Sequence, residues 1–282
     1  MARATVDDKG TVRPRWAFQG WHASLGRAVL DYVPALLVFF AILVVWQIVV
    51  IVNDIPLAIL PSPLRVAQTI VTEAGSLVSN TAVTMVEIVL GFVSGAFIGM
   101  VTGILIVYSR TLERMLYPLI VASQMIPVFA IAPLLIIWFG FGLSPKIIIA
   151  AIGVFFPICI NQVEGLRSVN PDLIKLMRAY SASKWQIFRM IAFPASIPFL
   201  VAGLQIGITF SVIGAVIAEW IGSENGLGAL MIASNSLSRT DIVFAAIVVL
   251  SVMGLIFFVG VRLVANWLCP WQKKPSARHG SP

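Results

Sequence analysis

The chain has 282 residues, of which 59% are hydrophobic and only 11% charged, and its net charge is +7. Soluble globular domains carry about 25% charged residues, so this composition, with a mean hydropathy of +0.98, excludes an ordinary soluble domain. Several apolar runs reach the roughly 18 residues that a helix needs to cross the hydrocarbon core. The sequence therefore predicts an all-α integral membrane protein. Because its basic residues lie between the apolar runs, they indicate membrane orientation and not nucleic-acid binding.

The first part of the chain is predicted to be a tail followed by one span. Residues 1–31 are polar and basic, and we expect a cytoplasmic tail that ends in an interfacial helix over 16–30. The first span covers about 32–52. The proline-rich segment after it should lie along the outer surface, with Ser62 as N-cap and Pro63 as the first residue of a short helix.

The second span, about 80–108, contains four glycines at a strict spacing of four: Gly91, Gly95, Gly99 and Gly103. This spacing places a smooth stripe on one helix face. In lipid, such a stripe lets two helix backbones approach closely. We interpret it as a packing surface, either within the subunit or against a second subunit, with a pore-lining role as the alternative.

The third span, about 118–139, follows a short polar turn over 110–114 and contains an amide and two prolines, namely Gln124, Pro127 and Pro133. These residues predict a broken or kinked helix that faces protein or a water-filled path. Further spans are expected over 146–162, 195–221 and 241–264. A loop rich in Gly, Ser and Asn separates the last two, and residues 266–282 form a basic cytoplasmic tail.

The distribution of basic residues orients these six spans. Of the 19 Lys and Arg residues, only Arg65, Lys146 and Arg239 fall on one side, and the other sixteen share the side of the N-terminus. Positive residues collect in cytoplasmic segments. Both termini and the segment 164–194 are therefore predicted to be cytoplasmic.

The segment 164–194 is basic and has helix signals of its own. Asn170 and Pro171 match an N-cap and a first helical position, which predicts a helix over 171–180. After a break at 181–183, a second helix over 184–191 should stop before Pro194. The first helix carries an apolar stripe beside basic residues, which favours docking of a soluble partner. The alternative is a pair of helices that merely rests on lipid.

The residues of this segment resemble a known family. The spacing from Ala179-Tyr180-Ser181 to Pro194, followed by Pro198 and Gly203, is similar to the cytoplasmic signature of permease subunits of binding-protein-dependent ABC importers. The supporting stretches are Leu60-Pro61-Ser62-Pro63, Trp138-Phe139-Gly140, Phe156-Pro157-Ile158 with Asn161, and Ala218-Glu219 followed by Gly226-Leu227-Gly228. The resemblance covers about residues 35–265, essentially the permease domain expected over 32–265. It points to the branch that imports sulfonates, taurine, nitrate or pyrimidine precursors.

The resemblance implies that the segment forms a pair of coupling helices that insert into a groove of a separate ATP-binding subunit. The positions that it assigns to coupling are Lys175, Met177, Arg178, Ala179, Tyr180, Ser181, Lys184, Ile191 and Pro194. Two of them depart from the family pattern, because Lys175 replaces a glutamate and Ser181 replaces a turn glycine. Serine is poorer than glycine where the backbone needs a positive φ, and Lys175 suggests a more acidic rim on the groove.

The resemblance also implies an external solute-binding protein, a permease homodimer and a multi-pass location in the bacterial inner membrane. The chain has no Gly-rich phosphate loop of the Walker type, so ATP and Mg²⁺ are expected on the partner subunit. It has no Cys/His cluster of zinc-site spacing and no nucleophile elbow. We therefore expect a non-catalytic subunit that binds no cofactor and no metal of its own.

Four residues are candidates for lining the translocation path, because they are polar or adaptable groups in apolar spans: Gln124, Met125, Asn161 and Glu219. Core packing is the alternative for Met125. Acidic groups at membrane depth cost about 2.5–3.5 kcal/mol on insertion scales, so Glu87 is expected to pair with a residue of a neighbouring span. Glu219 belongs either to an external gate or to a solvated interface.

A transporter driven by an ion gradient is the rival function. It would need ionisable relays within the membrane or an internal repeat. The spans offer two acidic residues and no convincing repeat, which favours the ATP-driven permease. Its mainly apolar path selects weakly, so the choice of solute is expected to rest with the binding protein.

Overall fold

The computed structural model describes residues 21–268, with side chains given for 33–267. Residues 1–20 and 269–282, which make up most of the predicted tails 1–31 and 266–282, lie outside the described residues. Within the described range the chain is all-helical, as expected. Five helices are long and apolar enough to cross a membrane, and a sixth span is present if one bent helix pair is counted as a span.

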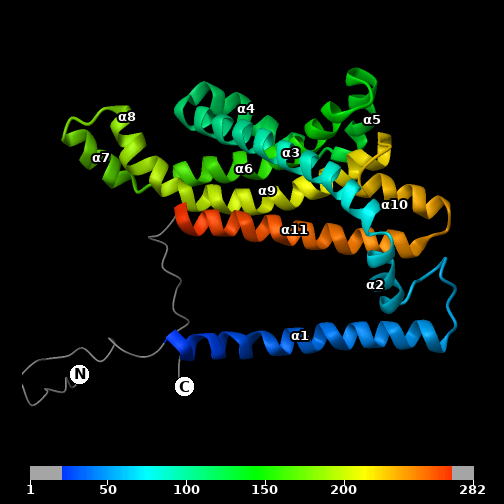
Figure 1. Ribbon diagram of the computed structural model, residues 1–282. Helices are drawn as coiled ribbons and strands as arrows, with labels where there is room; N and C mark the ends of the chain where they lie inside the picture. The colour runs from blue at the N-terminus through cyan, green and yellow to red at the C-terminus, as the bar shows by residue number, and fades with distance from the viewer. Residues whose placement is uncertain (1–20, 269–282) are drawn as a thin grey trace, which may run out of the picture.

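Five long helices make up most of the fold, and all but α1 form a bundle around α6 (Figure 1). The five are α1 (Trp21–Val52), α3 (Ala74–Tyr108), α6 (Leu143–Arg167), α9 (Phe193–Gly222) and α11 (Thr240–Leu268). α6 packs along both α3 and α9, and α11 packs on α9. Burial is therefore concentrated in α6, where Ile149, Val154 and Ile158 have at most 1% of their surface exposed.

Shorter helices connect the spans. They are α2 (Pro63–Thr72), α4 (Arg110–Ser123), α5 (Val128–Phe139), α7 (Pro171–Ala179), α8 (Lys184–Ile187), the π-helix Phe188–Ala192 and α10 (Leu227–Ser236). α7 and α8 lie at one end of the bundle, called here the α7 end. α2 and α10 lie at the opposite end, called the α10 end (Figure 1).

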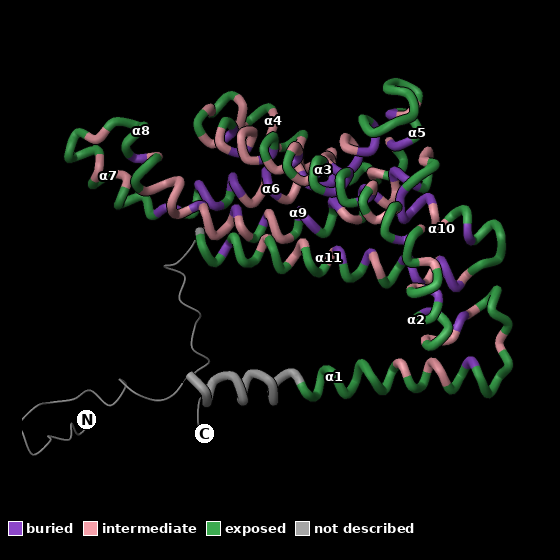
Figure 2. The backbone as a smooth tube through the Cα atoms, viewed as in Figure 1, coloured by how far each residue is buried: buried purple, intermediate pink, exposed green. Residues whose placement is uncertain are grey.

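α1 stands apart from the other long helices (Figures 1 and 2). It runs without a break from Trp21 to Val52, so the described part of the predicted interfacial helix, 21–30, is continuous with the span. It meets the rest of the chain through α2 and through Trp46, whose ring centroid lies 5.6 Å from that of Phe244 on α11. Most of its apolar surface is consequently exposed in a single copy.

The predicted break in the third span is present. α4 and α5 meet at an angle of 101° between Ser123 and Val128. The predicted polar turn at 110–114 is wrong, because these residues form the first turn of α4. Ser109 makes that start possible, since its hydroxyl accepts a hydrogen bond from the Leu112 N–H, as an N-cap does.

At the α10 end, one local prediction is confirmed and another is wrong. Ser62 caps α2, where its hydroxyl accepts from the Arg65 N–H and Pro63 stands at the start. The predicted loop between the last two spans instead contains α10. This helix begins after Gly226, whose φ of +117° favours glycine, and Leu227 at its start is fully buried.

Candidate functional site

The segment α7–α8 extends beyond the bundle at the α7 end (Figure 1). Its start follows from the sequence, because the Asn170 side chain accepts from the Asp172 N–H at 2.9 Å and Pro171 opens the helix. Five large apolar side chains of this region are exposed: Leu173, Leu176, Tyr180, Trp185 and Met190. Apolar groups that gather on a segment with basic neighbours indicate an interaction surface.

The turn after α7 has left-handed geometry at Ser181, where φ is +58°. The Ala182 N–H donates to the Met177 carbonyl at 3.0 Å and the Ser181 N–H donates to the Arg178 carbonyl at 2.9 Å. This is a Schellman motif, which usually has glycine at the left-handed position. The turn is thus made with serine, at a conformational cost of about 1–2 kcal/mol.

Lys175, the second departure from the family pattern, pairs with Asp172 on the same helix. The Lys175 ammonium lies 2.9 Å from Asp172 Oδ1, and both side chains are about three-quarters exposed. An exposed pair of this kind contributes little stability, so Lys175 remains free to exchange partners. Of the other residues assigned to coupling, Met177, Ile191 and Pro194 are half-buried, and Arg178, Ala179, Tyr180 and Lys184 are exposed.

The second helix of the segment was predicted to stop before Pro194, and this prediction is wrong. α8 passes through the π-helix directly into α9, so that 184–222 form one helical span of 39 residues. Proline lacks the N–H of a regular helix turn, and the wider π-turn just before Pro194 avoids the break. Phe188 packs there against Tyr108, with ring centroids 5.3 Å apart.

The four candidate path residues lie in different surroundings. Gln124 and Met125 are exposed at the break between α4 and α5. Asn161 is half-buried, and its amide donates to the Pro157 carbonyl at 2.8 Å. Glu219 is 1% exposed, so the solvated interfacial position considered for it is wrong. No hydrogen bond joins any two of the four among the residues described.

The glycine stripe of α3 lies against α6 within the same subunit. All four glycines are buried. A Cβ built on Gly99 would lie 2.8 Å from the Phe155 carbonyl oxygen, and one on Gly103 would lie 2.9 Å from the Gln162 Cβ. These distances are too short for any side chain, so α3 and α6 touch at their backbones along this face.

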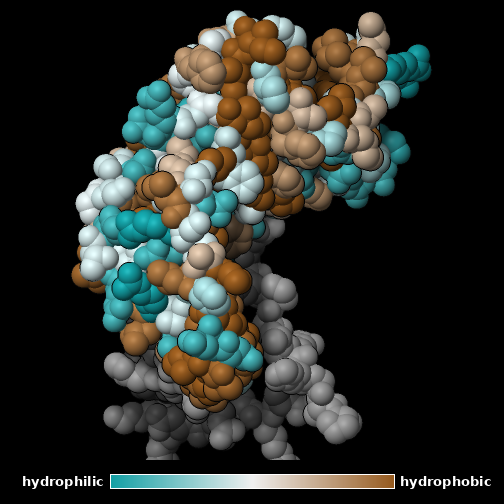
Figure 3. Space-filling model, turned by 90° about the vertical axis from the view of Figure 1, so that its right-hand side faces the viewer, coloured by the Kyte–Doolittle hydropathy of each residue, from teal (hydrophilic) through white to brown (hydrophobic). Residues whose placement is uncertain are grey.

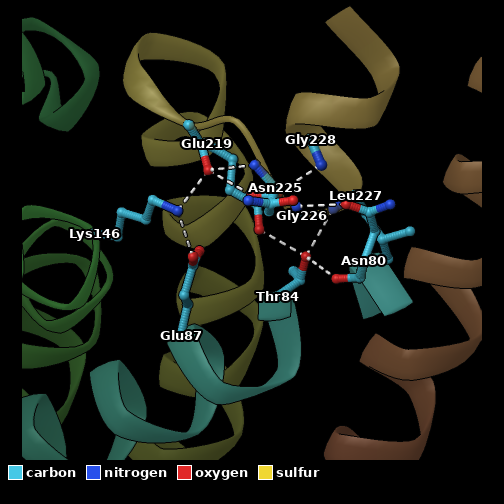
Figure 4. A network of polar contacts seen from close by, with 10 residues as sticks. Asn80, Thr84, Glu87, Lys146, Glu219, Asn225, Gly226, Leu227 and Gly228 are labelled. Carbon is cyan, nitrogen blue, oxygen red and sulfur yellow. Dashed lines mark hydrogen bonds and ion pairs between the residues drawn. The ribbon is translucent and has the colours of Figure 1, made fainter. Parts of the chain in front are cut away.

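Near the α10 end, α3, α6 and α9 bring together a set of polar groups that we call the external polar cluster (Figure 4). Its members are Asn80, Thr84, Glu87, Lys146, Glu219, Ser223 and the backbone of Gly226, Leu227 and Gly228. Seen from this end, hydrophilic side chains gather beside large hydrophobic areas (Figure 3). The cluster itself is mostly buried beneath that surface, since Glu87 is 0% and Lys146 8% exposed.

Glu219 and Thr84 hold the start of α10. Glu219 Oε2 accepts from the Gly228 N–H at 2.5 Å, and Oε1 is hydrogen-bonded to the Thr84 hydroxyl at 2.6 Å. The Thr84 hydroxyl also accepts from the Leu227 N–H at 2.9 Å. The first N–H groups of a helix have no partner within the helix. The bonds to Thr84 and Glu219 give partners to two of them in α10, those of Leu227 and Gly228.

Lys146 is the partner that Glu87 was expected to have. Its ammonium donates to Glu87 Oε1 at 2.7 Å and to the Ser223 hydroxyl at 2.5 Å. The lysine lies in the first turns of α6 and the glutamate lies within α3, so the pair joins two spans. Burial makes this pair costly to break, because one partner would be left as an uncompensated charge.

A second ionic group ties α2 to the start of α11. Asp241 is 1% exposed and accepts from the Thr69 hydroxyl at 3.1 Å. Arg65 and Arg239 each lie 3.7 Å from its Oδ2, and Arg239 also contacts Glu73 at 2.9 Å. Within the described residues, every Lys and Arg at the α10 end is therefore paired with a carboxylate.

Comparison with known proteins identifies the family to which this chain belongs. Residues 95–268 match the family described as "Binding-protein-dependent transport system inner membrane component". The chain belongs to this family. A probable ABC transporter permease of Haemophilus influenzae is 36% identical over 83% of this chain and 94% of its own length. The formylaminopyrimidine transport permease ThiX of Halalkalibacterium halodurans is 33% identical over 84% of this chain and 95% of its own.

The fold of this permease also resembles a solved structure. The inward facing MetNI methionine ABC transporter matches 70% of this chain and 98% of the compared chain, with a TM-score of 0.61 and 19% identity. The protein is thus a multi-pass permease subunit of an ABC importer in the inner membrane. This family decides against the rival transporter driven by an ion gradient.

The roles of several residues in the external polar cluster were not predicted from the sequence. Lys146 had been counted only as an outer basic residue, and Thr84 and Asn80 had been given no role. The available signal was the pair of acids at membrane depth, Glu87 and Glu219, because a buried acid requires a partner. Of the three outer cations, Lys146 is the one that falls within an expected span, 146–162. No group of three or more His, Cys, Asp or Glu that could hold a metal is found within the described residues.

Proposed function

We propose that the α7–α8 segment of this permease docks on a separate ATP-binding subunit, which carries ATP and Mg²⁺ and drives import. The charge distribution puts the α7 end in the cytoplasm, where such a subunit resides. The observation that carries the proposal is the exposed apolar set of α7–α8, which is continuous in sequence with a membrane span. Its basic neighbours, Lys184 and Arg178, suit a groove with an acidic rim.

The continuous helix 184–222 could transmit movement of the docking segment to the external polar cluster. At 1.5 Å per residue, its 39 residues span roughly 58 Å, from the proposed docking segment to Glu219 at the other end. A long helix transmits a displacement of one end to the other more directly than a loop does. Closure of the ATP-binding subunits is therefore proposed to move α9, and with it the external polar cluster.

The path itself is proposed to form between two copies of the permease. Gln124 and Met125 are exposed at the bend between α4 and α5 in a single copy. A hydrated path along them would be open to lipid unless a second subunit closed it. An external binding protein would deliver the solute at the α10 end.

For the solute, we propose a small heteroaromatic compound of the pyrimidine-precursor type, with an aliphatic sulfonate as the second candidate. Capture of a sulfonate or nitrate favours an unpaired cation near the entrance. In the described part of the permease, the cations of the α10 end are each held by a buried or neighbouring carboxylate. The ThiX relative is named for transport of such a pyrimidine.

The docking role is tested by co-purification of the permease with its ATP-binding subunit from cells that express both. The double variant Leu176→Ser/Tyr180→Ser should lose at least about tenfold of the bound subunit, because it removes apolar area at the centre of the proposed interface. The matched control is Val71→Ser on α2, which is 76% exposed at the opposite end. Equal recovery of the ATP-binding subunit with all three proteins would overturn the docking role.

A further inference from the structure

Two buried carboxyl groups meet in the external polar cluster. Glu87 is the only charged residue of α3, and Glu219 is the only charged residue of α9. Each has at most 1% of its surface exposed. Figure 4 shows the two side chains in the same polar cluster, which they enter from α3 and α9.

Among the residues described, one cation, Lys146, balances them. Lys146 contacts Glu87 directly, and the other helices packed around the pair add no further charge, because α5 and α10 contain no charged residue. Glu224 lies exposed on the adjoining loop. Asp241 at the start of α11 is held by Thr69. If both carboxyl groups of the pair were ionised, the buried set would therefore carry one uncompensated negative charge.

The hydrogen bonds of the two carboxyl groups give an independent reason to expect that one of them is protonated. Three of the four carboxyl oxygens have a donor: Lys146 serves Glu87 Oε1, and Thr84 and Gly228 serve Glu219. Glu87 Oε2 is buried and has no donor among the described residues. Two ionised carboxylates buried in one cluster repel each other, and such pairs normally retain a proton.

We propose that Glu87 and Glu219 share one proton, so that together with Lys146 they form a neutral unit. The proton supplies the missing donor of Glu87 Oε2 and removes the excess charge. The cleft lined by Glu87, Lys146 and Ser223 gives the unit a route for exchange with water at the α10 end. The unit fastens α9 and the start of α10 to α3, independently of which solute or ATP-binding subunit the permease serves.

Infrared spectroscopy of the purified full-length permease in lipid nanodiscs tests the proton directly. The wild type at neutral pH should show the C=O stretch of a buried protonated carboxyl group. Glu87→Gln and Glu219→Gln should each lose this band, because the charge of the one remaining carboxylate is then balanced by Lys146 without a proton. The control variant Asp241→Asn should keep it. Absence of the band from the wild type, or its persistence in both Gln variants, would overturn the proposal.

Thermal unfolding of the same preparations tests the charge balance without any transport assay. Glu87→Gln and Glu219→Gln should each stay close to the wild-type Tm, since each exchanges a shared proton for a neutral amide. The double variant leaves Lys146 unpaired and should lower Tm by roughly 10 °C, and addition of Lys146→Gln should restore it. A single Gln variant with a clearly raised Tm would mean that a charge, not a proton, had been removed, and the proposal would fail.

Discussion

Gly95 of α3 and Ala151 of α6 are in such close contact that a Cβ on Gly95 would lie 2.5 Å from the Ala151 carbonyl oxygen. A backbone oxygen cannot swing aside as a flexible side chain does. The two helices must therefore separate if any side chain is added at this point. Because α6 is also the helix that packs on α9, such a separation disturbs the centre of the bundle.

Gly95→Ala is expected to destabilise the permease by about 1–3 kcal/mol, the usual cost of overpacking a well-filled core. Gly75→Ala is the matched control on the same helix, because a Cβ there meets nothing within 4 Å. That variant should be neutral or slightly stabilising, since alanine is a better helix former. Thermal unfolding in detergent measures both, and equal effects would contradict the backbone contact.

Lys146→Met is expected to cost about 3–5 kcal/mol, because it leaves the buried Glu87 carboxyl without its cation. A fall in Tm and poor recovery of folded protein would report this loss. The comparison is Glu113→Gln, which removes the ion pair between Glu113 and Arg167 near the other end of α6. Those side chains are 37% and 40% exposed, so the loss there should stay below about 1 kcal/mol. Similar losses for the two variants would contradict the burial argument.

Ser181→Gly is expected to stabilise the turn after α7 by about 1 kcal/mol, because glycine adopts a positive φ without steric cost. Ser181→Val should have the opposite effect, since a β-branched residue is poorly tolerated there. Hydrogen exchange of the Ala182 amide, which bonds to the Met177 carbonyl, measures the local opening of the turn. Slower exchange in the valine variant than in wild type would show that the turn does not need a left-handed residue.

Local signals in the sequence predicted much of the fold because their causes are local. Long apolar runs define the spans, and the caps at Ser62 and Asn170 need only the two or three residues that follow them. The break in the third span was also predictable, because proline removes a hydrogen bond wherever it stands in a helix. These features depend little on the rest of the chain.

The wrong predictions concern places where distant residues decide. α10 looks like a loop by composition, but its first N–H groups are bonded to Thr84 and Glu219, which lie 143 and 9 residues away in sequence. Lys146 looked like an ordinary outer charge because its partner Glu87 belongs to another helix. The rule that proline ends a helix failed at Pro194. The helix widens to a π-turn just before this proline and then continues as α9.

The pair of Glu87 and Lys146 also constrains how the protein is inserted during synthesis. Glu87 is made 59 residues before Lys146, so α3 leaves the ribosome while its cation is still missing. A lone acidic group at membrane depth is costly, and α3 must therefore stay beside water or protein until α6 follows. We therefore expect the release of α3 into lipid to be delayed until the chain has been extended through the first turns of α6.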